Sequence, residues 1–334
     1  MGLPGNRCRE CPLFLRLRFH VPGTKVTDAT MAIVGEAPGS WEVANKRVFS
    51  GPSGKLLTTL LKLAEIDRDK ITVSNILACN PEKNKLPADL SLAIVCCSEI
   101  LEKDLAGINT IVGLGNIPLL ALTRQTLITK RRGSIYEIAN GRTFIGTLHP
   151  SALLRGSFVK KDEETKVLPK EVVVADLKRA KDIDEGWNWQ KEENYVTEPF
   201  PDDFTSFLAR LEKGEEVALD IETTYSKVRD AVPLLIGFSF EDTTLCAEFT
   251  DENLDWIAQA LASPAPKITH NGIFDIAVLR NVGFEIKNWA FDTLYSHHLM
   301  FAELPHNLGF VQSLYTSLPY HKHMKDSLEE DWDK

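Results

Sequence analysis

With 334 residues, 43% of them hydrophobic and 25% charged, the chain has the size and composition of a soluble protein with two ordinary domains. It has no run of eighteen apolar residues and no basic N-terminal stretch followed by an apolar one, which excludes a membrane span and a secretory signal and predicts a cytoplasmic protein. The net charge of −9 is unevenly divided, because residues 1–180 contain 26 Lys and Arg against 18 Asp and Glu, whereas residues 181–334 contain 12 against 29.

The first 183 residues alternate between predicted strands and helices. Short apolar runs predict strands at 31–36, 71–77 and 110–115, and the turn Asn140-Gly141 joins a predicted pair at 135–138 and 143–148. Apolar residues on a 3.6-residue period predict a helix from about residue 53, and further helices are predicted up to Leu105 and from Pro169 to about residue 183. This alternation predicts an α/β sandwich around a mostly parallel sheet.

Residues 184–203 are polar, acidic and without periodicity, which predicts a linker. After it, helices are predicted near 204–211 and 254–262, and strands at 216–221, 235–240, 244–249 and 267–270. The chain is therefore expected to divide into a domain of residues 1–183, a linker, and a second domain of residues 204–334.

Six cysteines lie at positions 8, 11, 79, 96, 97 and 246. Disulfides are a poor explanation in a reducing cytoplasm, so metal binding and simple burial compete. The CxxC pair of Cys8 and Cys11 is typical of a metal site, whereas Cys246, inside an apolar run, is expected to be a small core residue.

Four motifs follow one another in the first domain: VGEAPG at 34–39, VFSGPSGKLL at 48–57, SNILACNP at 74–81 and TLHPSALLR at 147–155. Their order and spacing resemble the family 4 uracil-DNA glycosylases over roughly residues 5–183. The resemblance implies a three-layer α/β/α sandwich, uracil-containing DNA as partner, and hydrolysis of the N-glycosidic bond of a flipped-out uracil by water. The basic charge of this half suits a phosphate backbone.

The resemblance also assigns roles to single residues. Phe49 would stack on the flipped base, and Asn75 would read its Watson–Crick edge, because an amide offers both a donor and an acceptor. His149 would bind uracil O2, where charge develops on the leaving group, and Glu36 would position or activate the water. Close backbone approach to DNA is expected at Gly35, Gly39 and Gly51, and phosphate contacts at Ser151 and the run Lys130-Arg131-Arg132.

The cysteines fit the same resemblance. Cys8, Cys11, Cys79 and one of Cys96 and Cys97 supply the four thiolates of a [4Fe-4S] cluster, which would pin the N-terminal segment and the 79–97 loop near the DNA. Alignment of the following helix favours Cys97 as the fourth ligand, and counting from Cys79 favours Cys96. Tetrahedral zinc bound by four thiolates is the alternative to the cluster.

Carboxylates distinguish the second domain. The run Ala218-Leu-Asp220-Ile-Glu222, then His270-Asn-Gly-Ile-Phe-Asp275 and Phe291-Asp-Thr-Leu, resembles the DnaQ-like 3′–5′ exonucleases, closest to the proofreading domain of family A DNA polymerases. The resemblance implies a ribonuclease H-like fold with a mixed sheet. Asp220 and Glu222 share one face of a strand, and with Asp275 they would hold two Mg²⁺ (or Mn²⁺) ions that activate water. The acidic balance suits such ions or simply a solvated surface.

The family's third motif, a Tyr or His several residues before a last Asp, does not occur, since Tyr320 and Asp326 have the wrong spacing. We therefore expect a truncated, inactive exonuclease and a polymerase region following in cis, as in phage-type DNA polymerases. Two alternatives remain. In the first, the first domain would be a non-catalytic DNA-binding or uracil-sensing module of a replicative polymerase. In the second, the exonuclease would be the main activity and the first domain would be a DNA clamp.

Overall fold

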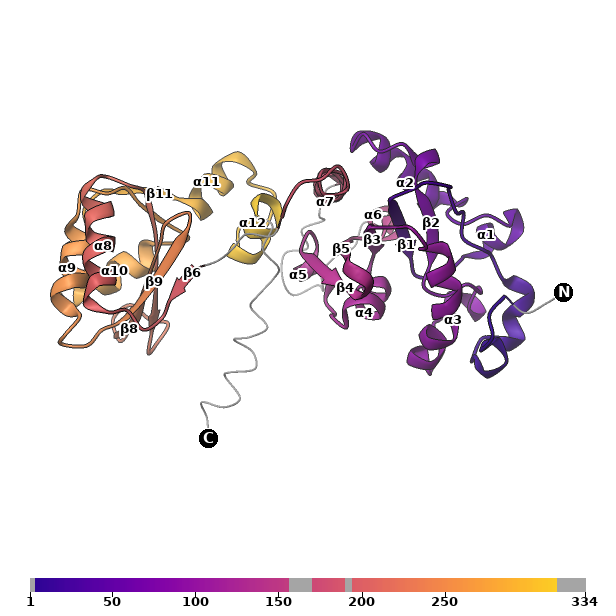
Figure 1. The fold of residues 1–334 in the computed structure, drawn as a ribbon, viewed down its shortest axis with the longest axis horizontal. Helices are drawn as coiled ribbons and strands as arrows, with labels where there is room; N and C mark the ends of the chain where they lie inside the picture. The colour runs from indigo at the N-terminus through magenta and orange to yellow at the C-terminus, as the bar shows by residue number, and fades with distance from the viewer. Residues whose placement is uncertain (1–3, 156–169, 190–193, 317–334) are drawn as a thin grey trace. The chain divides into compact units, whose positions relative to one another are not determined.

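The computed structural model describes residues 4–155, 170–189 and 194–316, which form two compact α/β units (Figure 1). The first unit contains the described residues up to Trp189 and those from Gln312 on, and the second contains the described residues from Asn194 to Val311. Tyr320 and Asp326 lie outside the described residues. Within the described part, no helix is both long enough and apolar enough to cross a membrane.

The first unit is built on a five-stranded sheet with the strand order β2-β1-β3-β5-β4. Four strands are parallel, and the edge strand β4 runs antiparallel to β5, which confirms the predicted mostly parallel sheet. The predicted turn between β4 and β5 is also confirmed, because Asn140 and Gly141 both have a φ of 66°. The strands are β1 (Met31–Gly35), β2 (Thr72–Asn75), β3 (Thr110–Leu114), β4 (Ile135–Ile138) and β5 (Arg142–Thr147).

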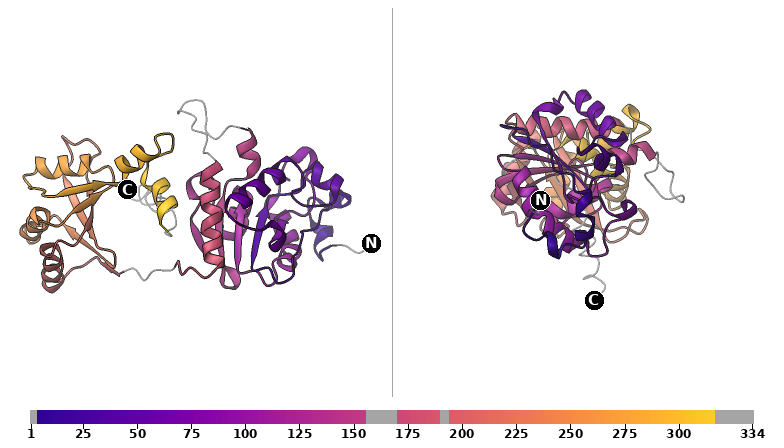
Figure 2. Two further views of the ribbon diagram at one scale, coloured as in Figure 1. Left: turned by 90° about the horizontal axis from the view of Figure 1, so that it is seen from above. Right: turned by 90° about the vertical axis from the view of Figure 1, so that its right-hand side faces the viewer.

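Helices cover both faces of this sheet (Figure 2). Helix α7 packs against α2, β3 and β5, and α4 also packs against β3 and β5. Right-handed crossovers place α2 on one face and α3 and α4 on the other, because the chain moves from β1 to β2 in one direction and from β2 to β3 in the opposite one. The helices are α1 (Ser40–Asn45), α2 (Pro52–Leu63), α3 (Leu90–Asp104), α4 (Asn116–Thr123), α5 (Ile128–Arg131), α6 (Pro150–Arg155) and α7 (Lys170–Asp184).

The core of the first unit lies between the sheet and these helices. Every residue of β1 is buried, as expected for a central strand of a parallel sheet. In α2, Leu57, Leu60 and Leu61 are fully buried, and burial of such a side chain contributes about 1.5–3 kcal/mol. These contacts fix the start of α2, and with it the loop before the helix, against the sheet.

The carboxyl ends of the parallel strands meet at one edge of the sheet. Gly35 ends β1, Asn75 ends β2, and His149 follows β5 by two residues. The chain changes direction at β1, which lies between β2 and β3. Ligands of open α/β sheets bind at such a reversal, outside the carboxyl ends of the strands.

The second unit contains a six-stranded mixed sheet, as predicted, in the order β11-β10-β7-β8-β9-β6. Strand β8 is antiparallel to β7 and β9, whereas β10 is parallel to β7 and β11. The segment predicted as a linker contains β6, which pairs in parallel with β9. The strands are β6 (Asn194–Val196), β7 (Val217–Thr223), β8 (Pro233–Ser239), β9 (Thr243–Glu248), β10 (Lys267–Thr269) and β11 (Trp289–Asp292).

Aromatic side chains fill much of the core between this sheet and its helices. The rings of Phe207 and Phe240 lie 4.3 Å apart, and Trp256 meets Phe238 edge to face at 5.4 Å. Helix α8 begins at Pro201 because proline suits the first helical position, and the Phe200 backbone N–H donates to Asp203. The helices are α8 (Pro201–Glu212), α9 (Leu254–Ala262), α10 (Ile273–Asn281) and α11 (Thr293–Met300). Helix α12 (Leu308–Tyr315) begins in this unit, and its residues from Gln312 on belong to the first.

Candidate functional site

Three of the predicted site residues meet around Gly35 at the carboxyl edge of the first sheet. The rings of Phe49 and His149 have centroids 5.9 Å apart and planes inclined at 32°. A Cβ atom on Gly35 would lie 2.4 Å from Oδ1 of Asn75 and 2.5 Å from Cζ of Phe49. The absence of a side chain at Gly35 therefore lets an aromatic face and an amide edge approach one another closely.

Asn75 is buried, yet its carboxamide has no hydrogen-bond partner among the described residues. Its backbone is fixed, because Asn75 pairs with Gly35 in the parallel ladder between β1 and β2. Buried amides are usually satisfied by protein or water. An amide that the fold fixes in place without using its donor or its acceptor is suited to reading a ligand edge.

The hydrogen bonds of His149 determine its tautomer. The backbone N–H of Ser151 donates to Nδ1 at 3.1 Å, and the Ser151 hydroxyl lies 2.8 Å from the same nitrogen. Because a backbone N–H can only donate, Nδ1 carries no proton, and the neutral ring carries its proton on Nε2. Burial and the charge of Arg155 lower the pKa of His149 to about 4. The imidazole is thus a neutral donor through Nε2 at ordinary pH.

Glu36 directly follows β1 and is partly buried. Burial raises its pKa above the usual range, and the positive charge of Arg155 offsets part of this effect. Its backbone carbonyl accepts from Leu77 N–H at 2.9 Å, which continues the pairing of β1 and β2 past their ends. The carboxyl group is therefore held at the carboxyl edge of the sheet, near Arg155.

Sequence reasoning gave no role to Glu42, whose carboxylate links the loop that contains Gly39 to the loop that contains Gly51. Its carboxylate accepts from Gly39 N–H at 3.1 Å and from Gly51 N–H at 2.9 Å. A glutamate three residues after a helix N-cap is a known capping pattern, so the first of these bonds had a sequence signal. The second did not, because Gly51 lies nine residues further on.

Arg68 is a second residue that sequence reasoning did not identify. Its guanidinium donates to the Phe49 carbonyl at 2.9 Å and to the Gly54 carbonyl at 2.8 Å. Phe49 has a φ of 49°, in the left-handed region that bulky residues rarely adopt. Arg68 stabilises this conformation, which turns the Phe49 ring toward His149.

One predicted contact is wrong. Arg132, expected to hold a DNA phosphate, is fully buried and forms an ion pair with Asp176, which also accepts from the Thr147 hydroxyl. A buried, paired guanidinium cannot reach a phosphate without breaking this bond. Arg131 is buried as well, and Lys130 alone of this run is exposed.

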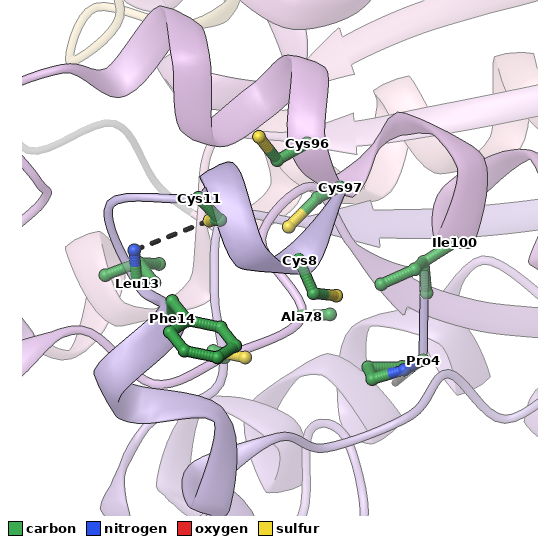
Figure 3. A pocket seen from close by; sticks show the side chains of 10 residues that line it. Pro4, Cys8, Cys11, Leu13, Phe14, Ala78, Cys96, Cys97 and Ile100 are labelled. Carbon is green, nitrogen blue, oxygen red and sulfur yellow. Dashed lines mark hydrogen bonds between the residues drawn. The ribbon is translucent and has the colours of Figure 1, made fainter. Parts of the chain in front are cut away.

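Five cysteines line one pocket between the N-terminal segment and the middle of α3 (Figure 3). They are Cys8, Cys11, Cys79, Cys96 and Cys97, with Pro4, Leu13, Phe14, Ala78 and Ile100 completing the wall. The N-terminal segment runs along the residues beside Cys79, since Val21 N–H donates to the Ala78 carbonyl at 2.9 Å. Segments separated by seventy residues thus bring their thiols together.

The two neighbouring cysteines of α3 face different directions. In Figure 3, Cys97 points toward Cys8 and Cys11, and Cys96 projects from another side of the helix, as adjacent helical residues must. Burial, together with the charges of Cys97, Cys11 and Cys8, raises the pKa of Cys79 to about 12. Cys97 therefore belongs to the same group as the other three thiols.

The spacing of the thiols distinguishes a single metal ion from a cluster. No three His, Cys, Asp or Glu side chains in the part of the chain that the structure describes lie close enough to bind one metal ion. In a four-iron cluster each thiolate binds a different iron, so its ligands surround a pocket and do not converge on a point. An apolar pocket lined by thiols fits the cluster better than it fits tetrahedral zinc.

In the second unit, the charges of the predicted carboxylates act on one another. Asp220 and Glu222 are exposed on one face of β7, while Leu219 and Ile221 point into the core. Asp275 is buried in the first turn of α10. Burial and the charges of Asp220, Asp292 and Glu222 raise the pKa of Asp275 to about 7. As the structure places them, these carboxylates do not lie close enough for three of them to share one ion. Carboxylate oxygens are the ligands that Mg²⁺ prefers, and a divalent ion bound among them would relieve this repulsion.

Asp292 is a further carboxylate to which sequence reasoning gave no role. It accepts from Gly272 N–H at 2.7 Å and from the Thr269 hydroxyl at 2.9 Å, and it also caps α11 through Leu294 N–H. Burial raises the pKa of Asp292, but these hydrogen bonds outweigh that effect, so the pKa is lowered overall. Asp292 therefore holds the turn between β10 and α10, immediately before Asp275.

Comparison with known proteins gives a match in each half of the chain. Residues 22–172 match the family model described as the uracil DNA glycosylase superfamily, and residues 199–334 match the model described as a 3′-5′ exonuclease of the DNA polymerase A type. The chain is 35% identical to the type-4 uracil-DNA glycosylase of Thermotoga maritima over 154 residues, which are 45% of this chain and 79% of that protein. It is 30% identical to the type-4 enzyme of Archaeoglobus fulgidus, over 47% of this chain and 83% of that protein.

A third relative spans both halves. The chain is 29% identical to the DNA polymerase of Bacillus phage SP01 over 224 residues, which are 65% of this chain and only 23% of that polymerase. Among solved structures, Escherichia coli RNase D is 20% identical with a TM-score of 0.33, over 40% of this chain and 36% of that one. The chain thus spans about a quarter of the phage polymerase and about a third of RNase D.

Proposed function

Because this chain belongs to the uracil DNA glycosylase superfamily, through a domain followed by a DNA polymerase A type 3′-5′ exonuclease domain, we propose that its first half excises uracil from DNA. The reaction is hydrolysis of the N-glycosidic bond, with water as the nucleophile. We assign it to residues 1–183, with residues 184–203 as linker. The observation that carries the proposal is the neutral His149, held as an Nε2 donor beside the ring of Phe49.

Recognition of the base uses the two partners around Gly35. Uracil leaves the stack, lies on the Phe49 ring, and presents its Watson–Crick edge to Asn75. The amide of Asn75 offers a donor and an acceptor and has no described protein partner to give up. Cytosine has an amine where uracil has O4, so the same amide orientation leaves a donor facing a donor.

Bond cleavage uses His149 and Glu36. As the bond to the sugar breaks, negative charge develops on the uracil, and His149 Nε2–H donates to O2. A neutral donor supplies this bond without needing a proton from solution. Glu36 in its ionised form orients the water that attacks the sugar carbon, and the water proton passes to its carboxylate. Gly35, Gly39 and Gly51 would let the DNA backbone approach, and Ser151, besides holding His149, would contact a phosphate.

We further propose that Cys8, Cys11, Cys79 and Cys97 hold a [4Fe-4S] cluster, with Cys96 beside it but not a ligand. The support is the direction of Cys97 in Figure 3 and the apolar pocket that the thiols line. When bound, the cluster supplies a structural cross-link. These four residues then fix the N-terminal segment to the loop after β2 and to α3.

For the second half we propose a 3′–5′ exonuclease site in which Asp220, Glu222 and Asp275 hold Mg²⁺ or Mn²⁺. The raised pKa of Asp275 beside these like charges favours it. Both halves act on DNA, and the similarity to a phage DNA polymerase supports a polymerase region in cis.

The proposal is tested by uracil release from a single-stranded oligonucleotide, with protein purified without oxygen. Wild type is compared with Asn75→Ala and Glu36→Ala, and with Glu185→Ala, a surface change at the end of α7. We expect release by wild type and by Glu185→Ala, and a loss of about 10²–10³-fold in the two site variants. Iron-loaded wild type that binds the DNA and releases no uracil overturns the proposal and leaves a DNA-binding module.

A further inference from the structure

Trp41 lies in α1 with 62% of its surface exposed, although tryptophan is the largest apolar side chain. Its indole N–H has no hydrogen-bond partner among the described residues. A single exposed apolar side chain is ordinary on a protein surface, so the case for Trp41 depends on what surrounds it. None of the steps assigned above to the first unit uses this ring.

The backbone of Trp41 is part of the rigid rim of the Phe49 pocket. A Cβ atom on Gly51 would lie 3.0 Å from Cβ of Trp41, so the two residues are in direct contact. The Ser50 hydroxyl donates to the Trp41 carbonyl at 3.4 Å. The next residue, Glu42, binds the amides of both Gly39 and Gly51. The backbone that carries the indole is therefore held in place by contacts with Ser50 and Gly51, the two residues that follow Phe49 in the chain.

The positively charged side chains on the segments next to Trp41 and Gly51 favour binding of a polyanion. Lys46 and Arg47 follow α1 and are exposed, and Lys55 is exposed on the first turns of α2. The acidic neighbour Glu42 is engaged by the two glycine amides. An exposed aromatic ring among cations is the combination with which proteins bind unpaired nucleic acid, through base stacking and phosphate attraction.

We propose that Trp41 is a stacking platform for an unpaired DNA base next to the flipped uracil, outside the base pocket. This inference rests on the proposed function, because it assumes that DNA enters at this edge of the sheet. The ring contributes to binding equally before and during bond cleavage, so it lowers KM and leaves kcat unchanged. Stacking tolerates any base, so its contribution is independent of the neighbouring sequence.

The experiment uses a single-stranded oligonucleotide with one tetrahydrofuran abasic site for binding, and the matching uracil oligonucleotide for kinetics. Trp41→Ala is expected to raise both Kd and KM about 5- to 150-fold, the effect of losing one base stack, with kcat unchanged. Trp41→Phe keeps a ring and is expected to retain most of the affinity. The matched control is Trp187→Ala, which removes an exposed indole near Asp184, a residue bound to Thr30 at the opposite edge of the sheet.

Indole fluorescence supplies a readout that a purely structural role would not change. We expect the abasic oligonucleotide to quench wild-type emission, and the quenching to disappear in Trp41→Phe and persist in Trp187→Phe. Unchanged Kd in Trp41→Ala, or quenching that persists in Trp41→Phe, overturns the inference. Wild type that binds the oligonucleotide without releasing uracil overturns only the proposed function, and Kd of Trp41→Ala then still decides the inference.

Discussion

Ser151 donates its backbone N–H to Nδ1 of His149 over 3.1 Å, across the turn between β5 and α6. The donor is a main-chain N–H, so of the substitutions at residue 151 only proline removes it. Together with burial, which lowers the pKa of His149 to about 4, it keeps the ring neutral with its proton on Nε2. The pH dependence of the reaction must then come from another group.

We expect that group to be Glu36. Burial raises its pKa above 4.5, so the carboxyl group takes up a proton as pH falls while His149 is still neutral. The ionised form is the active one, so kcat/KM should fall on the acid side, by one proton, at a pH above 4.5. Single-turnover uracil release between pH 4 and 8 measures this, with Glu36→Gln as the comparison.

The Glu36→Gln variant should release uracil slowly and lose the acid limb, because glutamine does not titrate. A limb near pH 6.5 that survives in this variant would contradict the assignment, since it would show that His149 titrates at its ordinary pKa.

Gly35→Ala tests whether the pocket depends on the close approach at Gly35. The added Cβ would fall 2.4 Å from Asn75 and 2.5 Å from Phe49, so one or both must move. A displacement of about 1 Å costs about 100-fold in rate, and we expect kcat/KM to fall by at least that factor. The matched control is Gly237→Ala, where a Cβ would meet nothing closer than the Asp220 carbonyl at 3.9 Å.

Overpacking also lowers the free energy of unfolding, by about 1–3 kcal/mol. Both variants should therefore be assayed below their thermal transitions, followed by circular dichroism. Full activity in folded Gly35→Ala would mean that Asn75 and Phe49 do not act together on one base.

Much of the first sheet and the pocket could be predicted from the sequence because the signals are local. Apolar runs predicted β1 and β2, and the motifs that end these strands predicted Gly35, Glu36 and Asn75, which the parallel ladder brings to one edge. Residues that act through distant backbone groups carried no such signal. Arg68 binds the carbonyl of Phe49, nineteen residues away, and nothing in the local sequence distinguishes it from a surface arginine.

The errors have a physical cause as well. Arg132 reads as part of a basic run, but its partner Asp176 is 44 residues away, and only tertiary structure shows that the pair is buried. Strand β6 is three residues long and lies within a polar stretch, so periodicity could not reveal it. It forms because the edge of β9 offers backbone partners, which is a property of the folded sheet.

Cys97→Ser and Cys96→Ser separate the two candidates for the fourth cluster ligand. Cys97 points toward Cys8 and Cys11, so its replacement should remove most of the iron and the visible absorbance of the purified protein. Cys96→Ser should retain both, as should Cys246→Ser in the second unit. Iron and zinc are measured by plasma emission on protein prepared without oxygen. The reverse order of iron loss, or zinc in place of iron in the wild type, would contradict the assignment.

The carboxylate site in the second unit makes a prediction that does not depend on nuclease activity. Asp275 has a pKa raised to about 7 in the metal-free site, by burial and by Asp220, Asp292 and Glu222. A metal ion binds the ionised form, so below pH 7 protons compete with it, and Mn²⁺ affinity should fall about tenfold per pH unit. Above pH 7 the affinity should level off.

Calorimetric titration with Mn²⁺ between pH 5.5 and 8.5 measures this. Asp275→Asn should bind weakly with little pH dependence, and Asp255→Asn, on the first turn of α9, should behave as wild type. Affinity that does not change with pH in the wild type would show that Asp275 is not a ligand.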